Sequence, residues 1–125
     1  MVTGYELLLG TPLYDGNIAA VETHIGKTTP NGKHEALVGE TYRYDMLGRL
    51  DSSHFHTFDT STRTWSASAE AYKTGYEYDA NGNITKLMRH GYDSASINTQ
   101  MDSLAYAYAN PNKNRLDSVH EAVTG

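Results

Sequence analysis

Few residues of this chain have the types and spacing that chemistry requires, and the first candidates are a pair of histidines. His54 and His56, in the segment HFHTF, would share one face of a β-strand, as two metal ligands should. A closed zinc site needs about four ligands, and the chain has no Cys and no third His nearby in sequence. We therefore expect an exposed strand face here, and neither a metal ion nor another cofactor.

Catalytic signatures are also missing. The sequence has no G-x-S-x-G elbow, no H-E-x-x-H motif and no phosphate-binding G-x-x-x-x-G-K loop. A glycan hydrolase would need two carboxylates held about 5–10 Å apart across a cleft. Asp15, Asp45 and Asp79 instead recur at one position beside expected turns, where capping of the turn explains them better than acid–base catalysis. The chain is therefore not expected to be an enzyme.

Aromatic side chains offer another kind of chemistry, because a tyrosine ring can stack on a sugar ring. The pairs Tyr42/Tyr44, Tyr76/Tyr78 and Tyr106/Tyr108 each follow a Tyr-x-Tyr spacing, which places both rings on one face of a strand. Aromatic residues on one face of adjacent strands also stabilise a sheet by roughly 0.2–1 kcal/mol per pair. The regular spacing favours this structural role.

The single tryptophan has the same two interpretations. Trp65 lies between two tyrosine pairs, in the segment TRTWSAS, and we expect it to anchor a loop onto the sheet. The alternative is a carbohydrate- or cell-surface-binding module in which Trp65 and the tyrosine rows contact the ligand.

Composition and charge exclude several classes of partner. The formal net charge is −5, the sequence pI is near 5.6, and the ten basic residues are scattered singly. This argues against nucleic acid and anionic membranes as partners. The longest aliphatic cluster is ELLL at residues 6–9, far too short for a membrane span. Leu, Ile, Val and Phe number only 21 of 125 residues, so the core should be thin.

The elements that position these residues come from an internal repeat. Residues 42–50, YRYDMLGRL, and 76–84, YEYDANGNI, share a Tyr-x-Tyr-Asp-x-x-Gly pattern that ends in a polar and a branched apolar residue. A shorter copy, LYDGNI, covers 13–18, and YAYANPNKNRL covers 106–116 with Asn114 in place of Gly. Aligned positions are 32, 34 and 32 residues apart. The expected repeat units are 13–38, 39–73, 74–102 and 103–125, within a single domain.

Each unit predicts two strands joined by a tight turn. In the third unit the tyrosines alternate with acidic residues, and Asn81-Gly82 suits the left-handed backbone of a turn. Asp79 can cap this turn by accepting a hydrogen bond from the backbone N–H two residues on. Ile84 and Leu87 have opposite parity, so burial of both on one face requires a β-bulge after the turn.

The remaining units follow the same pattern. Strands are expected at 40–45, 49–58, 103–109 and 115–121. The weakly patterned segments 26–39 and 59–73 are expected to be loops between units, and ASAEAY in the second of them could start a short helix. The expected fold is all-β, an antiparallel twisted sheet of successive β-hairpins. One face should carry the tyrosine rows with Leu50, Ile84 and Leu116.

The repeated motif resembles the YD repeat of RHS proteins, and the layout from YDGNI to NRLDSV is similar to RHS-repeat proteins of the Bacteroidetes type over roughly residues 13–119. The motif positions are Tyr14, Asp15, Gly16, Tyr42, Tyr44, Asp45, Gly48, Tyr76, Tyr78, Asp79, Gly82, Tyr106 and Tyr108. The resemblance implies a β-strip that spirals into a hollow shell around a cargo such as a toxin domain. Members of this family act in bacterial competition, in insecticidal toxin complexes or at cell surfaces, so the resemblance implies a parent protein that is secreted or lies at the cell surface.

Shells of this kind contain many more repeats than this chain does. The resemblance therefore implies a non-catalytic wall segment of a longer parent protein, whose partners are neighbouring repeats and an enclosed cargo domain. A strip of hairpins cannot cover its own apolar face, and its first and last strands are open edges. We expect the isolated chain to be marginally stable or to associate with itself.

Overall fold

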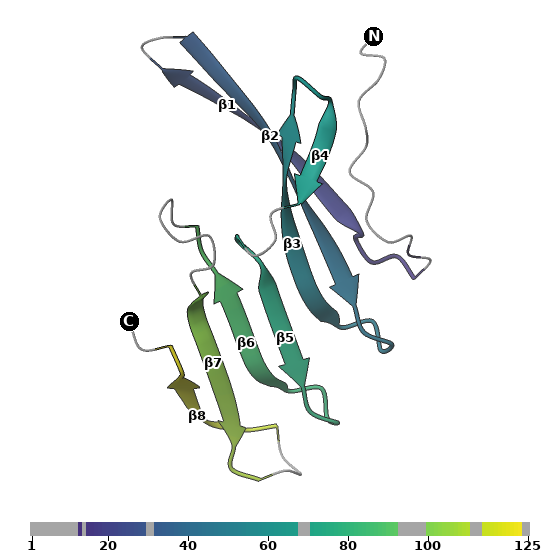
Figure 1. The fold of residues 1–125 in the computed structure, drawn as a ribbon. Helices are drawn as coiled ribbons and strands as arrows, with labels where there is room; N and C mark the ends of the chain where they lie inside the picture. Colours follow the sequence, from purple (N-terminus) through teal and green to yellow (C-terminus); the bar gives the residue numbers. More distant parts are fainter. Residues whose placement is uncertain are drawn as a thin grey trace.

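The computed structural model describes residues 13, 15–29, 32–67, 71–92, 100–110 and 114–123. These residues form one antiparallel sheet of eight strands and contain no helix (Figure 1). The all-β fold that the repeats predict is confirmed. The strands are β1 (Ala20–Thr29), β2 (Gly32–Tyr44), β3 (Leu50–Asp59), β4 (Thr64–Ala67), β5 (Thr74–Tyr78), β6 (Ile84–His90), β7 (Gln100–Tyr108) and β8 (Leu116–Glu121).

The sheet is a row of hairpins arranged in chain order. The strand order is β1-β2-β3-β5-β6-β7-β8, and β4 pairs with β3 beside this path. The turns of the repeat motif join β2 to β3, β5 to β6 and β7 to β8, while β1–β2, β3–β5 and β6–β7 pair one repeat with the next. Each of these strands therefore lies beside a strand that is near to it in sequence (Figure 1).

The sheet is a single layer, and the described residues build almost no core. In Figure 1 the described residues form no second layer over either face of the strands. Among the described residues the only buried hydrophobic side chain is Ala71, which is 3% exposed, and no large side chain is fully buried. The apolar side of the strip is thus partly open to solvent, as the small aliphatic content predicts.

Strand register separates two faces of the sheet, because directly opposed residues of antiparallel strands share a face. The pairs Tyr42↔Ser53, Ser53↔Thr74 and Tyr76↔Leu87 connect one face across the middle of the sheet. We call this the tyrosine face. Its members include Val21, Val38, Tyr42, Phe55, Tyr76, Leu87, Leu104, Tyr106 and Val119.

A β-bulge follows the turn of each of the three motif hairpins, β2–β3, β5–β6 and β7–β8. Tyr78 pairs with Ile84 while Glu77 pairs with Lys86, so Thr85 is the extra residue. The same register shift makes Asp51 the extra residue in the β2–β3 hairpin and Asp117 the extra residue in the β7–β8 hairpin. The bulge brings the residue after each turn onto the tyrosine face, which confirms the prediction from residue parity and the predicted placement of Leu50, Ile84 and Leu116.

Two sequence-based assignments are wrong. Residues 26–39 are not a loop between units, because β1 and β2 pair without interruption from Ala20↔Thr41 to Thr29↔Gly32. The segment is polar, but its threonines are compatible with a strand, and Pro30-Asn31-Gly32 is a sequence signal for a hairpin that outweighs weak alternation.

Segment 59–73 is also not purely a loop. It contains β4, which folds back onto the end of β3 through the pairs Phe58↔Trp65 and Asp59↔Thr64. Of the ASAEAY stretch, residues 68–70 lie outside the described residues, and Ala71 and Tyr72 lie in a turn.

Candidate functional site

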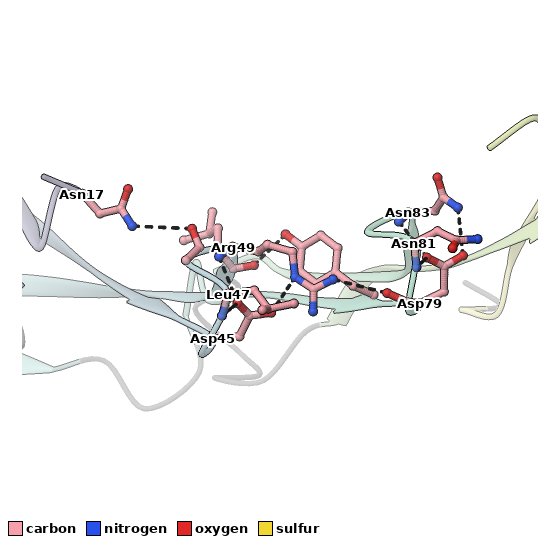
Figure 2. Close-up of polar contacts among 10 residues, drawn as sticks. Asn17, Asp45, Leu47, Arg49, Asp79, Asn81 and Asn83 are labelled. Atoms are coloured by element: carbon pink, nitrogen blue, oxygen red, sulfur yellow. Dashed lines mark hydrogen bonds and ion pairs between the residues drawn. The ribbon is translucent and has the colours of Figure 1, made fainter. Parts of the chain in front are cut away.

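The turn of the second unit is built around one carboxylate. Asp45 Oδ1 accepts hydrogen bonds from the backbone N–H groups of Leu47 (2.9 Å) and Arg49 (3.0 Å), and Oδ2 accepts one from Arg49 Nε (2.6 Å) (Figure 2). The backbone closes the loop, since Gly48 N–H donates to Asp45 O at 3.0 Å and Asp45 N–H donates to Arg49 O at 2.9 Å. Gly48 has φ of 74°, the left-handed conformation that this three-residue loop requires.

The third unit repeats this geometry with different side chains. Asp79 Oδ1 accepts from the N–H groups of Asn81 (2.9 Å) and Asn83 (2.8 Å), and Oδ2 accepts from Asn83 Nδ2 (2.8 Å). Gly82 has φ of 86°. Arginine and asparagine are interchangeable after the glycine because either can donate to the second carboxylate oxygen. The predicted capping role of the motif aspartate is confirmed in both turns.

The first and fourth units depart from this pattern. In the shortened first turn, Asp15 Oδ1 accepts from Asn17 N–H (3.2 Å), Oδ2 accepts from Asn17 Nδ2 (3.1 Å), and Gly16 has φ of 86°. The fourth unit has Ala109 where the other units have the capping aspartate. Tyr14 lies outside the described residues.

The electrostatics of the turns suit a structural carboxylate. The backbone N–H of Arg49, followed by that residue's side chain, lowers the pKa of Asp45. The side-chain amide of Asn83, followed by its backbone N–H, lowers the pKa of Asp79. A general acid at neutral pH requires the opposite shift, which burial in an apolar site produces.

A second set of contacts connects each repeat to the preceding one through the second tyrosine of the pair. Its hydroxyl donates to the backbone carbonyl of the branched apolar residue that ends the preceding motif, which we call the closing residue. The three bonds run from Tyr44 to Ile18 (2.9 Å), from Tyr78 to Leu50 (2.7 Å) and from Tyr108 to Ile84 (2.8 Å). The tyrosine near the start of one motif therefore bonds to the residue at the end of the preceding motif.

The first tyrosine of a pair behaves differently. Tyr42 donates its hydroxyl to Glu40 Oε2 in its own strand (2.9 Å), and burial followed by this carboxylate raises the pKa of Tyr42 to about 12. For Tyr76 and Tyr106, no hydroxyl hydrogen bond to another repeat occurs among the described residues. The two tyrosines of a pair look equivalent in sequence, but the second of each pair makes the bond between repeats.

A third contact comes from the polar residue after the turn glycine, which we call the post-glycine residue. Its side chain reaches the turn of the following unit: Asn17 Nδ2 to Gly48 O (3.5 Å), Arg49 Nη1 to Asp79 O (3.3 Å) and Asn83 Nδ2 to Asn114 Oδ1 (3.1 Å). Figure 2 shows Arg49 lying between its own turn and that of Asp79. We call the tyrosine bonds and these side-chain contacts together the repeat ladder.

The ladder is most needed where β3 meets β5. Only Ser52↔Gly75 and Ser53↔Thr74 pair there, because β4 occupies the same edge of β3 from His56 to Asp59. We call this short pairing the β3–β5 seam.

Further side-chain contacts occur at this seam. Ser53, which is 2% exposed, shares a hydrogen bond of 2.8 Å with the Thr74 hydroxyl. The Arg49 guanidinium lies 4.5 Å from the centre of the Tyr78 ring, in addition to the bonds already described. These contacts add to the two backbone pairings of the seam.

The other candidates from the sequence lie elsewhere. His54 and His56 lie on the face of the sheet opposite the tyrosine face. On that opposite face, His56 Nε2 lies 2.9 Å from Thr41 Oγ1. Burial, followed by the neighbouring His54, lowers the pKa of His56. No cluster of three or more His, Cys, Asp or Glu side chains that could hold a metal occurs within the described residues.

Trp65 packs edge-to-face on Phe58, with ring centres 5.2 Å apart. This contact ties β4 to β3, which matches the predicted anchoring role. Phe58 and Phe55 have opposite parity along β3, so Trp65 and the tyrosine rows lie on opposite faces of the sheet.

Sequence reasoning missed an aromatic cluster on the tyrosine face. Phe55 packs edge-to-face on Tyr72 at 5.1 Å, and Tyr72 stacks with Tyr92 at 6.2 Å. With Thr57 and Ala71, these rings line a hollow of about 390 Å³. Tyr72 has φ of 56°, an uncommon conformation for a residue with a large side chain. No sequence signal marks this cluster, because its members come from three separate segments.

Comparison with protein-family models, with curated proteins and with solved structures finds no match for this chain. In the part of the chain that the structure describes, no helix is long and apolar enough to cross a membrane.

Proposed function

We propose that this chain is a non-catalytic wall segment of a YD-repeat shell of the RHS type. In this proposal the hairpins extend a continuous hydrogen-bonded wall, neighbouring repeats of a longer parent continue it on both sides, and the shell encloses a cargo such as a toxin domain. The parent is secreted or displayed at the cell surface. The resemblance of the nine-residue motif to the YD repeat supports the family, and the geometry of the joins supports the structural role.

The observation that carries the proposal is that three joins between repeats have one register. In each join, the residue two positions after the closing residue of one unit pairs directly with the residue just before the tyrosine pair of the next unit. These pairs are Ala20↔Thr41, Ser52↔Gly75 and Lys86↔Ala105. A wall that grows by addition of equivalent units requires this constancy, whereas a domain built around one site has no need of it.

The use of the motif side chains supports the same conclusion. The aspartates cap their own turns, the second tyrosines bond to the preceding unit, and the post-glycine residues contact the following one. These three kinds of motif side chain are therefore occupied in holding the sheet together.

Interchangeable joins can be tested by removing one repeat. Deletion of residues 75–104 connects Thr74 to Ala105 and brings the fourth tyrosine pair beside β3 in the register that the third pair now has. We expect the shortened chain to retain slowly exchanging amides in β2, β3, β7 and β8. Deletion of residues 75–103 is the matched control, because the one retained residue, Leu104, shifts the register and turns each side chain to the other face.

The outcomes separate the wall from a compact domain. Protection that survives the first deletion and is lost in the control supports equivalent repeats. If both shortened chains lose all protected amides, the repeats are not interchangeable and the wall proposal fails.

One observation favours the second candidate, a carbohydrate-binding module. Tyr72 and Tyr92 are 50% and 60% exposed and stack beside the hollow on the tyrosine face, so they offer flat rings to a ligand. Titration with soluble glycans, followed by the amide resonances of Ala71–Tyr72 and Gly91–Tyr92, tests this function. Shifts confined to these residues would support binding, and unchanged spectra would leave the wall as the sole proposal.

A further inference from the structure

After its turn, the fourth repeat carries the same chemical groups that the earlier repeats use to contact the repeat that follows them. Its closing residue is Leu116, and its post-glycine residue is Arg115, which follows Asn114. Both side chains are exposed, Leu116 to 46%. β8 pairs with β7 along one edge, and no strand pairs with its outer edge in the part of the chain that the structure describes.

We propose that the outer edge of β8 is a docking site for a Tyr-x-Tyr-Asp-x-x-Gly hairpin that has a free strand edge. This inference rests on the proposed function and specifies the partner and the register at one edge. The incoming strand adds to the sheet by backbone hydrogen bonding, as in peptide recognition by strand addition. The repeat need not belong to the same chain, because each contact of the join is local to two adjacent hairpins.

The internal joins give the register of the docked hairpin. Ser118 lies two residues after the closing residue, so it should be directly opposed to the residue before the incoming tyrosine pair, as Lys86 is to Ala105. The second incoming tyrosine then donates to the Leu116 carbonyl, as Tyr108 does to that of Ile84. Arg115 reaches the incoming turn, as Arg49 reaches the carbonyl of Asp79.

A second folded copy of this chain does not supply such a strand from its described residues. Its tyrosine-pair strands are β2, β5 and β7, and each already lies between two neighbours in the sheet. Its described N-terminal edge, β1, carries no Tyr-x-Tyr sequence. The occupant that fits is therefore a separate hairpin of the same repeat.

The docking site can be tested on the full chain. A copy of residues 73–90, which includes the third-unit hairpin, is appended after Gly125 through a flexible Gly/Ser linker, so that the two ends meet at high effective concentration. Hydrogen exchange of the β8 amides is compared with that of the unextended chain. We expect exchange in β8 to slow by about tenfold, whereas exchange in β1 should be unchanged.

Two variants of the appended hairpin test the register. In the first variant, the appended residue that corresponds to Tyr78 is changed to Phe. This change removes the hydroxyl that should reach the Leu116 carbonyl, and it should reduce the protection of β8 about fivefold. In the second variant, the appended residue that corresponds to Tyr76, two residues away on the same strand, is changed to Phe, which should leave the protection intact. Arg115→Gln in the host chain should also weaken docking.

Three outcomes would overturn the inference. The first is that the appended hairpin leaves hydrogen exchange in β8 unchanged, and the second is that both phenylalanine variants leave the protection of β8 intact. The third is that β8 becomes protected in the unextended chain as its concentration rises, which would make a second copy the occupant. If the same substitution in the chain's own third unit weakens the internal join while β8 stays unprotected, docking alone fails and the wall proposal stands.

Discussion

The hydroxyl of Tyr78 can be removed without disturbing the rest of its environment, and Tyr78→Phe therefore isolates one bond of the repeat ladder. The substitution deletes the 2.7 Å hydrogen bond to Leu50 O. It keeps the ring, which lies 4.5 Å from the Arg49 guanidinium. The bond crosses the β3–β5 seam, where only two residue pairs hold the strands together.

The expected cost is about 1 kcal/mol, the usual net contribution of a hydrogen bond between neutral groups. The cost rises toward 2 kcal/mol if the half-buried carbonyl of Leu50 finds no replacement donor. A change of 1 kcal/mol lowers the melting temperature of a chain of this size by about 4 °C. It also increases the population in which the seam is open by about fivefold.

Two measurements check this expectation. Urea unfolding followed by circular dichroism gives the change in the free energy of unfolding. Hydrogen exchange of Ser52, Ser53, Thr74 and Gly75 then shows whether the loss is local to the seam. The matched control is Tyr76→Phe, which removes a hydroxyl from the same strand at a position with no hydrogen bond to another repeat in the described residues.

The comparison between the two variants decides the outcome. We expect Tyr78→Phe to speed exchange at the seam and Tyr76→Phe to leave it unchanged. Equal effects of the two substitutions would refute the assignment of the second tyrosine as the bond between repeats.

Two further predictions concern the turns and the dependence on pH. Gly82→Ala should cost about 1 kcal/mol by urea unfolding, because φ is 86° and an added Cβ meets no atom within 4 Å, so only backbone strain is introduced. Gly26→Ala is its control, since a Cβ there also meets no atom and φ is not in the left-handed region; a loss as large as that of Gly82→Ala would contradict the backbone argument. Hydrogen bonds lower the pKa values of two carboxyl groups below the ordinary 3.8: the main donor is the Arg49 backbone N–H for Asp45 and the Asn83 side-chain amide for Asp79. Burial lowers the pKa of His56 below 6.5. The folded chain then binds fewer protons than the unfolded chain, so stability should fall as the pH drops below about 6.5 and fall further below about 4. Thermal unfolding across this range checks the prediction, and a melting temperature that rises on acidification would contradict it.

Much of the candidate site could be predicted because it depends on neighbours in sequence. A motif aspartate meets its capping partners two and four residues on, and a glycine allows the left-handed turn. The parity of Ile84 and Leu87 required the bulge that the structure contains. The post-glycine residue could have been found in the sequence, since Asn17, Arg49 and Asn83 are all polar at the same repeat position. No sequence signal marks the group in the next turn that it contacts.

The sequence by itself determined the all-β class, the turns of the repeated motif and the face on which the tyrosines lie. These follow from residue spacing and from backbone preferences within a few residues. Only the tertiary structure decided which tyrosine of a pair connects the repeats, because Tyr76 and Tyr78 share a face and differ only in what the register places within reach. It also decided that β4 shortens the β3–β5 seam and that Phe55, Tyr72 and Tyr92 form a cluster. A backbone carbonyl such as that of Leu50 is chemically the same in every residue, so it becomes a specific acceptor only when strand pairing brings a donor to it.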